Sequence, residues 1–196
     1  MLKFPRLILA SASPRRADLL SQIGLKFEIF PSNIPEITSN KNATSEVVTQ
    51  ELALQKARSV AEYHTEGIVI GADTLVSLEN ELLGKPKNTI HAQEMLTRLS
   101  GTCHKVVTGV AVIDAKLQRE KTWVEVTNVQ FRELCHSEIV AYIDSGEAAD
   151  KAGAYGIQGR GAAFVKRIEG CYFNVVGLPL ASLVEQLMEF ESDANV

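Results

Sequence analysis

The sequence lacks any hydrophobic run long enough to span a membrane, and its first residues contain one lysine and no long apolar core. We therefore expect neither a membrane-spanning helix nor a signal peptide. Cysteine is scarce: Cys103, Cys135 and Cys171 are odd in number, and none belongs to a C-x-x-C pair. A disulfide framework and a zinc knuckle are not expected, and the reducing cytoplasm is the expected location.

Positive charge is also scarce, because 20 Lys and Arg face 24 Asp and Glu, for a net charge of −4. Broad binding to nucleic acid or to an anionic membrane needs a basic field, so we expect neither as a partner. The sequence contains no G-x-x-x-x-G-K-[ST] phosphate loop and no H-E-x-x-H metal motif. Any anion site must therefore be built from a local group of cations.

The 196 residues, 45% of them hydrophobic, suffice for a sizeable core. No internal repeat and no Pro/Gly-rich linker divides the chain, so we expect a single domain over 1–196 with a polar, frayed end at 192–196. Apolar runs predict strands at 7–10, 26–30, 67–71, 106–113, 123–131 and 162–168, and a hairpin over 75–83 that turns at Glu79-Asn80. Helical periodicity predicts helices at 14–23, 45–63, 89–99 (capped by Thr89), 137–143 and 179–190. The fold class is α/β, with part of the sheet antiparallel.

Two arginines occupy the start of the first predicted helix, in the stretch LILASASPRRADLL. The first turn of a helix exposes unpaired N–H groups and the positive end of the dipole, so Arg15 and Arg16 are misplaced there unless an anion binds. A strand, a short Ser-rich loop and a helix start form an anion-binding geometry, to which Ser11 and Ser13 add hydroxyl groups. The alternative is that both arginines are solvated or pair with Asp18 or a distant carboxylate.

Three further charged residues are candidates for the same anion-binding site. Asp73 follows the strand 67–71, at the carboxyl end where α/β folds place ligands, although a turn-forming Asp is common. Lys85 lies in the turn LGKP, where glycine permits close approach and proline stiffens the chain. Lys56 lies among apolar residues of the second helix and could extend toward a pocket. Taken singly, both lysines fit a solvated surface position as well.

The segment DKAGAYGIQG combines small residues with an amide side chain. Its glycines let the backbone reach a planar ligand, and Gln158 offers a donor and an acceptor to the edge of a base. The alternative is an ordinary Gly-rich turn.

The adjacent pairs Cys103-His104 and Cys135-His136 carry no mark of a nucleophile and its base, so we expect both histidines to fill core or surface positions.

These pieces, in this order, resemble the Maf family of nucleoside triphosphate pyrophosphatases. The matching stretches are LILASASPRRADLL, GADTLVSLENELLGKP, LSGTCHKVVTGVAV and DKAGAYGIQGRGAAFVKRIEGCYFNVVGLPL. The resemblance covers the chain from about Leu7 to Leu187. It implies an elongated α/β fold with a mixed sheet, flanking helices and a cleft between two lobes, like that of the Ham1 proteins. It also implies hydrolysis of a nucleoside triphosphate to the monophosphate and pyrophosphate, a divalent cation (Mg²⁺ or Mn²⁺) and a homodimer.

The resemblance also assigns roles to residues. Asp73 matches the family's proton-acceptor position, as a general base or as a metal ligand. The positions that match the family's phosphate cleft are Ser11, Arg15, Arg16, Lys56 and Lys85. Glu36 is a candidate metal ligand, but the Asp that often precedes it in the family is Pro35 here, which leaves the metal shell incomplete.

Three positions separate the subtypes of the family. The subtype acting on dTTP and UTP has Arg, Thr and Gln, whereas the subtype acting on 7-methyl-GTP has Trp, Gln and Glu. This sequence has Arg15, Thr74 and Gln158, and so resembles the dTTP/UTP type. Two alternatives stay open: a non-catalytic nucleotide-binding regulator of cell division, and an enzyme that removes modified pyrimidine triphosphates.

Overall fold

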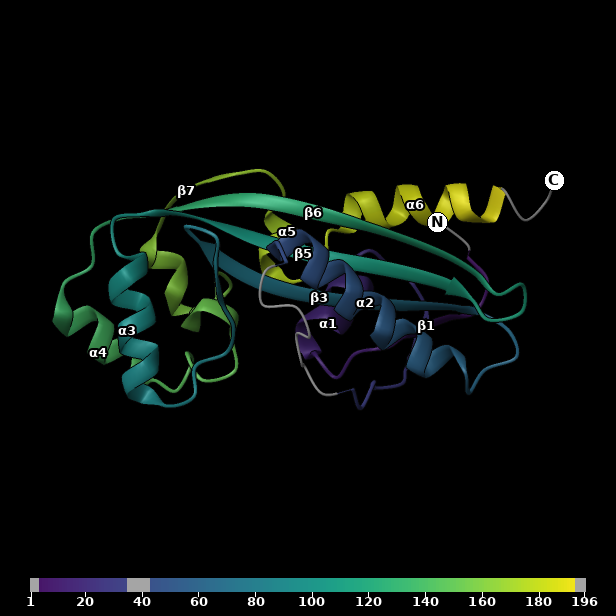
Figure 1. Cartoon of the computed structure of the whole chain (residues 1–196), viewed down its shortest axis with the longest axis horizontal. Coiled ribbons are helices and arrows are strands. Elements are labelled where there is room, and N and C mark those ends of the chain that lie inside the picture. The colour runs from purple at the N-terminus through teal and green to yellow at the C-terminus, as the bar shows by residue number, and fades with distance from the viewer. Residues whose placement is uncertain (1–3, 35–42, 193–196) are drawn as a thin grey trace. The chain divides into compact units, whose positions relative to one another are not determined.

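The computed structural model describes residues 4–34 and 43–192, the side chains through Phe190. Its elements, most of which are labelled in Figure 1, are β1 (Leu7–Leu9), α1 (Pro14–Gln22), β2 (Phe27–Ile29), α2 (Ser45–Ala61), β3 (Ile68–Leu78), β4 (Glu81–Leu83), α3 (Thr89–Leu99), β5 (Cys103–Asp114), β6 (Arg119–Phe131), α4 (His136–Asp144), the 3-10 turns η1 (Ala152–Ala154) and η2 (Arg160–Phe164), β7 (Val165–Glu169), α5 (Tyr172–Val176) and α6 (Leu180–Ser192). None of the helices in these ranges is long and apolar enough to cross a membrane.

The strands form a seven-stranded sheet in the order β2-β1-β3-β5-β6-β7, with β4 paired to β3. β1 runs parallel to both β2 and β3, whereas the β3–β4 and β6–β7 pairs are antiparallel. The sheet is therefore mixed, as expected. The β3–β4 hairpin turns at Glu79 and Asn80, both with positive φ, which is the backbone of a type I′ turn.

The chain divides into two compact units. Unit 1 comprises residues 1–73, 108–125 and 177–196, and unit 2 comprises 74–107 and 126–176. Three of the four boundaries fall inside β3, β5 and β6, and the fourth follows the last residue of α5, Val176. The prediction of one domain with two lobes stays a prediction.

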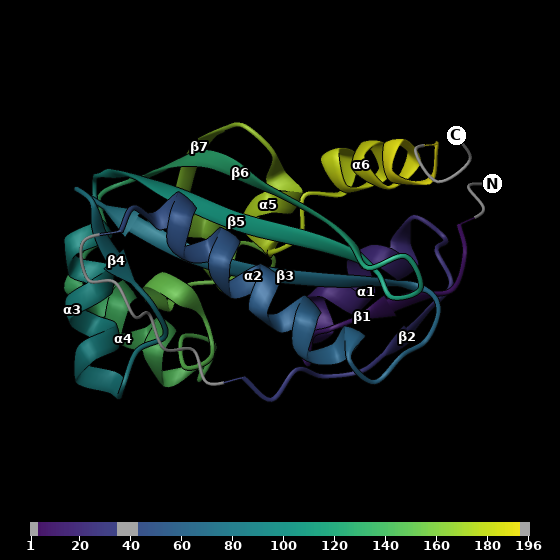
Figure 2. The same cartoon turned by 45° about the vertical axis from the view of Figure 1, so that its right-hand side comes forward.

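In unit 1, α2 packs on β3 and β5 at two glycines (Figure 2). A Cβ built on Gly71 would lie 2.3 Å from the carbonyl oxygen of Ala53, and one on Gly109 would lie 2.3 Å from the carbonyl oxygen of Thr49. Only glycine permits so close an approach of helix and sheet backbones. The apolar cluster at this contact contains Ile8, Ala10, Ala53, Ala57, Val60, Ala61, Val69, Ala111 and Ile113.

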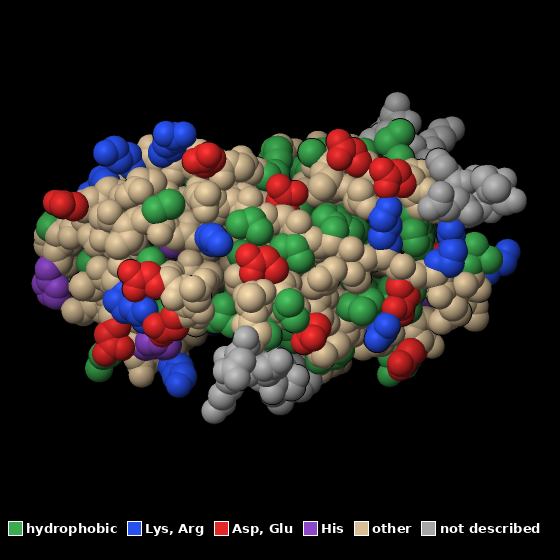
Figure 3. All heavy atoms as spheres, turned by 45° about the horizontal axis from the view of Figure 1, so that its top comes forward, with side chains coloured by type: hydrophobic (Ala, Val, Ile, Leu, Met, Phe, Trp, Pro, Cys, Tyr) green, Lys and Arg blue, Asp and Glu red, His purple; other side chains and the backbone are tan. Residues whose placement is uncertain are grey.

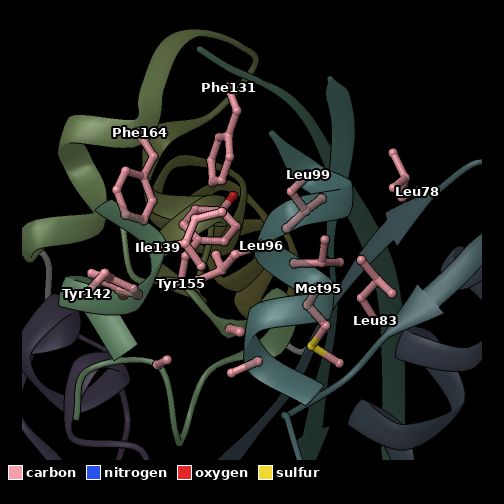
Figure 4. Packing of buried hydrophobic residues seen from close by; sticks show 14 of the residues in the cluster. Leu78, Leu83, Met95, Leu96, Leu99, Phe131, Ile139, Tyr142, Tyr155 and Phe164 are labelled. Carbon is pink, nitrogen blue, oxygen red and sulfur yellow. The ribbon is translucent and has the colours of Figure 1, made fainter. Parts of the chain in front are cut away.

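Unit 2 has its own core, formed by the sheet, α3, α4 and the 3-10 turns (Figure 4). Aromatic rings dominate one side of it: Phe131 lies 4.7 Å from Tyr155 and 5.9 Å from Phe164, centroid to centroid, and Phe164 lies 4.9 Å from Tyr142. All of these contacts are edge-to-face, the arrangement that aromatic quadrupoles favour. These ring contacts pack the segment 142–164 against the core of unit 2.

Several local expectations need correction. The strand predicted at 67–71 and the first arm of the hairpin are one continuous strand, β3. The N-cap of α3 is Asn88, whose side chain accepts from the His91 N–H, and Thr89 is the first helical residue. The strand predicted from residue 162 starts at Val165, after η2. α5 was not expected, and Ser192 still belongs to α6, while 193–196 lie outside the described residues.

Candidate functional site

The loop between β1 and α1 brings Ser11 and Arg16 together. The Arg16 Nε donates to the Gly177 carbonyl oxygen at 2.8 Å, and its Nη1 donates to Ser11 Oγ at 3.1 Å. Ser11 Oγ also accepts the backbone N–H of Ser13 at 3.2 Å, so its own hydroxyl proton is available to a ligand. These hydrogen bonds fix the Arg16 side chain against the loop. The Ser11 hydroxyl and the Arg16 guanidinium therefore lie next to each other.

The helix start itself keeps its anion-binding character. Ser13 is the N-cap of α1 and makes no side-chain capping bond, Pro14 follows it, and the first turn contains no acidic residue. Arg15 is half-buried on that turn. The start of a helix, with the positive end of its dipole, and two guanidinium groups thus lie at the β1–α1 loop, an arrangement suited to phosphate.

Lys56 and Asp73 form a buried ion pair. The Lys56 Nζ lies 2.5 Å from Asp73 Oδ1, and the two side chains are 9% and 7% exposed. The close contact between α2 and β3 at Gly71 explains why Lys56 and Asp73 lie next to each other. Side chains on a strand alternate, so Asp73 shares the face on which Gly71 meets α2, and Lys56 lies one residue before Ala57 at that contact.

Asp73 does not end its strand, contrary to the expectation, because β3 continues to Leu78. It nevertheless lies beyond the carboxyl end of the neighbouring parallel strand. β1 ends at Leu9, which pairs with Ile70, and the Ala10 N–H donates to the Ile70 carbonyl oxygen at 2.8 Å. The Ser11 loop leaves the sheet there, while β3 carries Asp73 onward. The carboxylate therefore lies near the carboxyl end of β1 and in the middle of its own strand.

The other predicted residues, Thr74, Lys85 and Gln158, belong to unit 2. Thr74 is half-buried on β3, and Lys85 is exposed just after β4. Gln158 is exposed in the loop between η1 and η2.

Two residues that the sequence analysis missed hold the loop of Gln158. Tyr142 Oη accepts the Gly156 N–H at 3.0 Å and donates to Glu147 Oε1 at 3.1 Å. Glu147 also accepts the backbone N–H groups of Arg160, at 2.9 Å, and of Gly161, at 3.4 Å. No local sequence pattern marks Glu147 as a residue of the site, because it lies in a polar turn. The glycines nearby indicate only that another part of the protein lies close to the backbone there.

The described residues contain no group of three or more His, Cys, Asp or Glu side chains able to hold a metal ion. Glu36 and its neighbour Pro35 lie outside the described residues. Asp73 offers a carboxylate of which Lys56 contacts one oxygen. A single carboxylate fits Mg²⁺ bound largely through substrate phosphates and water, and it does not fit an all-protein metal cage.

Neither Cys–His pair forms a catalytic couple. His104 is buried, and its Nε2 lies 2.8 Å from the Tyr155 hydroxyl; burial lowers the pKa of His104 to about 4. His136 is exposed at the start of α4. Both histidines therefore fill core and surface positions, as expected.

Comparison with known proteins covers almost the whole chain. The family described as Maf-like protein matches residues 6–190. A dTTP/UTP pyrophosphatase of Carboxydothermus hydrogenoformans is 50% identical over 185 residues, 94% of this chain and 98% of the relative. Proteins of the same name from Bacillus cereus and Lachnoclostridium phytofermentans are 50% and 47% identical, over 97% and 96% of this chain and 98% and 96% of the relatives.

Among solved structures, a HAM1 protein from Coxiella burnetii has a TM-score of 0.47 and 16% identity, covering 81% of this chain and 91% of its own. A nucleoside-triphosphatase described as a dITP/XTP pyrophosphatase, from Mycobacterium abscessus, has a TM-score of 0.43 and 14% identity, covering 66% and 75%. The sequence comparisons are therefore the ones that bear on what this chain is.

Proposed function

Because this chain belongs to the Maf family, we propose that it hydrolyses nucleoside triphosphates, preferentially dTTP and UTP, to the monophosphate and pyrophosphate. Three relatives named dTTP/UTP pyrophosphatase, 47–50% identical over nearly their whole length, support this substrate choice. The observation that carries the chemistry is the buried Lys56–Asp73 pair, because a carboxylate and an ammonium group are held together where water is largely excluded.

The cations neutralise the substrate. A triphosphate carries about four negative charges, which repel an incoming water, and positioning with electrostatic stabilisation supplies most of the rate in such reactions. Arg16 and the Ser11 hydroxyl bind phosphate oxygens, together with Arg15 and the Ser13 N-cap at the start of α1. Lys56 and Lys85 supply further positive charge.

Asp73 receives the proton of the attacking water. The carboxylate accepts from Lys56 through Oδ1, which fixes its orientation, and a carboxylate has further acceptor sites for a water. The water attacks the α-phosphorus, the bond to the bridging oxygen breaks, and pyrophosphate leaves. General-base catalysis of this kind contributes about 10²–10⁴-fold.

A divalent cation, Mg²⁺ or Mn²⁺, would be held by Asp73 and by Glu36, with substrate phosphates completing its shell. When bound, such an ion neutralises phosphate charge and lowers the pKa of a coordinated water. Asp73 as a metal ligand is the alternative to Asp73 as a base.

Gln158 reads the base, because its amide can pair with the O4 and N3–H edge that thymine and uracil share. Arg15 and Thr74 are the other two specificity positions. We expect Gln158→Ala to weaken discrimination among bases more than it weakens binding of phosphate.

The protein acts as a homodimer in the cytoplasm, with no nucleic acid or membrane partner, under this proposal. The three cysteines are free, which supports a reducing compartment. A net charge of −4 supports the absence of polyanionic partners.

Release of monophosphate and pyrophosphate from dTTP, UTP, CTP, GTP, ITP and 7-methyl-GTP, with Mg²⁺ or Mn²⁺, tests the proposal. We expect turnover of dTTP and UTP, and a loss of about 10²–10⁴-fold in kcat for Asp73→Asn with nucleotide binding kept. Asparagine retains an oxygen for Lys56, so this variant should fold. Asp144→Asn, at an exposed position, is the matched control and should match the wild type.

The same assay separates the alternatives. A non-catalytic regulator would bind nucleotide without turnover, and full activity of Asp73→Asn would contradict the role of the carboxylate. An enzyme for modified pyrimidines would hydrolyse 5-substituted or otherwise altered triphosphates faster than dTTP and UTP.

A further inference from the structure

The Gln158 loop is rich in glycine and would be mobile without outside support. Gly156, Gly159 and Gly161 surround Gln158 within six residues. Glycine has the largest backbone freedom of any residue, so ordering such a loop costs more conformational entropy than ordering an ordinary one. A side chain on a mobile loop cannot discriminate between bases by hydrogen bonding, since the position of its amide must be defined.

Two side chains outside the loop supply that support. The carboxylate of Glu147 accepts three hydrogen bonds: from the backbone N–H groups of Arg160 and Gly161 and from the Tyr142 hydroxyl. The same hydroxyl accepts the Gly156 N–H at 3.0 Å. The loop is thus bound at both ends, before and after Gln158, by one connected pair.

Close packing around the carboxylate explains the glycines. A Cβ at Gly159 would lie 2.3 Å from Glu147 Oε1, and a Cβ at Gly161 would lie 2.7 Å from the Gly156 carbonyl oxygen. Glu147 is itself fixed through its backbone, because the Lys151 Nζ donates to the Glu147 carbonyl oxygen at 2.8 Å. The loop backbone therefore wraps around this one side chain.

The support is anchored in the core of unit 2. The Tyr142 ring is buried and packs edge-to-face on Phe164, with centroids 4.9 Å apart (Figure 4). Burial, and then the nearby Glu147 charge, raise the pKa of Tyr142, which keeps the hydroxyl protonated as a donor to Glu147.

We infer that Glu147, together with Tyr142, is a positioning residue for base selection: it holds the loop of residues 156–161 so that Gln158 presents its amide to the pyrimidine edge. This inference rests on the proposed function and on Gln158 as the reader of the base. Neither residue touches the substrate. Their loss should therefore change the choice among bases and leave phosphate binding intact.

Glu147→Gln and Tyr142→Phe test this inference while preserving size and packing. Glutamine can accept through only one atom, so at least one N–H of the loop loses its partner. Phenylalanine keeps the ring on Phe164 but leaves Gly156 without its acceptor. We expect each variant to reduce the UTP to CTP ratio of kcat/KM by about tenfold, mainly by raising KM for UTP, which is the effect of losing one charge-assisted hydrogen bond.

Three further measurements separate positioning from mere stability. Inhibition by inorganic pyrophosphate should be unchanged, since the phosphate-binding residues of unit 1 are intact. Hydrogen exchange at residues 156–161 should accelerate. In a Gln158→Ala background, Glu147→Gln should reduce the UTP to CTP ratio no further, because a residue that acts through Gln158 has no effect on selectivity without it. Tyr172→Phe and Glu169→Gln, at exposed positions of the same unit, are the matched controls.

The outcomes distinguish the two levels of the proposal. A wild-type protein that hydrolyses neither dTTP nor UTP overturns the proposed function, and this inference with it. An active wild type whose UTP to CTP ratio is unchanged in Glu147→Gln and Tyr142→Phe overturns the inference alone. Equal loss on every substrate, or additive loss with Gln158→Ala, likewise makes the pair structural only.

Discussion

The Lys56–Asp73 pair illustrates that a buried charged side chain needs an oppositely charged partner close by. Removing two charges from water costs several kcal/mol per ion, and their attraction offsets this cost only when the geometry is close. Here the atoms are 2.5 Å apart and both side chains are less than a tenth exposed. Such a pair is weak evidence for stability, so a role in the chemistry of the site explains it better.

His104 is the second buried titratable residue with consequences at this scale. Its Nε2 contacts the Tyr155 hydroxyl, and its Nδ1 has no hydrogen-bond partner within the described part of the chain. Burial lowers the pKa of His104 from 6.5 to about 4. Between these two values the unfolded chain binds a proton that the folded protein does not, so the free energy of unfolding rises with pH through this window and levels off above 6.5.

We expect this residue to contribute roughly 3 kcal/mol to the pH dependence of unfolding between pH 4 and 6.5, as the shift implies. Urea unfolding at several pH values, compared between the wild type and His104→Gln, measures it; the slope should flatten in the variant. His136→Gln, at an exposed position, is the control. An unchanged slope in His104→Gln would show that the histidine titrates normally. Glu138, whose pKa is lowered from 4.5 to about 2 by Arg132, acts mainly below pH 4 and overlaps this window only at its lower end.

The sequence names candidate residues for the site, and their roles stay predictions, whereas the contacts that the structure gives them could not be predicted. Arg15 and Arg16 are candidates because two cations are unusual at the start of a helix, and Asp73 is one because it follows an apolar run. The role of Lys56 follows from its ion pair with Asp73. The two residues are 17 positions apart in the sequence, and no local pattern predicts that they pair. Glu147 illustrates the same limit, because its three hydrogen-bond donors become neighbours only when the chain folds.

At the scale of elements, the crossing of α2 over β3 and β5 determines where Lys56 lies. Gly71 and Gly109 let the helix backbone descend onto the sheet, as the contacts of Ala53, Ala57 and Thr49 show. The sequence predicts only that Gly71 is the last residue of the strand 67–71, because the apolar run ends there. Its actual role, a close approach in mid-strand, depends on a helix that precedes it by ten or more residues.

Adding one methyl group at these crossings should be costly. We expect Gly71→Ala and Gly109→Ala each to destabilise the protein by about 3 kcal/mol, since a Cβ would meet backbone atoms that cannot rotate away. Urea denaturation measures this. Gly84→Ala is the matched control, because its Cβ would have nothing within 4 Å, and its free energy of unfolding should change by less than about 0.5 kcal/mol. Equal effects at all three positions would contradict the crossing argument.

The type and order of the elements followed from the sequence better than their ends. α2 and the strands β5 and β6 lie close to where the sequence predicts a helix and two strands, although their ends differ by a few residues, because a long stretch with one type of pattern constrains the structure over many residues. The N-cap of α3 was placed one residue late, since Asn88 and Thr89 are both good caps and only the hydrogen bond to His91 decides between them. β3 was divided in two because its central residues, Gly71 to Thr74, resemble a turn.

At the scale of the molecule, charge is the property that most limits the partners. The face in Figure 3 carries acidic and basic side chains interspersed, which matches a net charge of −4. Arg15 and Arg16 are adjacent cations in a protein whose net charge is −4. Such a distribution suits a small, highly charged anion better than a long polyanion, which must be met by a continuous basic surface.

The expected consequence is that the protein binds a triphosphate but not DNA in the same buffer. In an electrophoretic mobility assay at about 0.1 M salt, nonspecific DNA-binding proteins bind with a Kd of roughly 10⁻⁴–10⁻⁶ M, and we expect no shift of double-stranded DNA up to about 10⁻⁴ M of this protein. Binding of dTTP to Asp73→Asn, measured by calorimetry, is the positive control. A DNA shift that disappears with added dTTP would mean that DNA ends enter the phosphate site. A shift that dTTP does not affect, with a steep dependence on salt, would reveal a basic surface and contradict the charge argument.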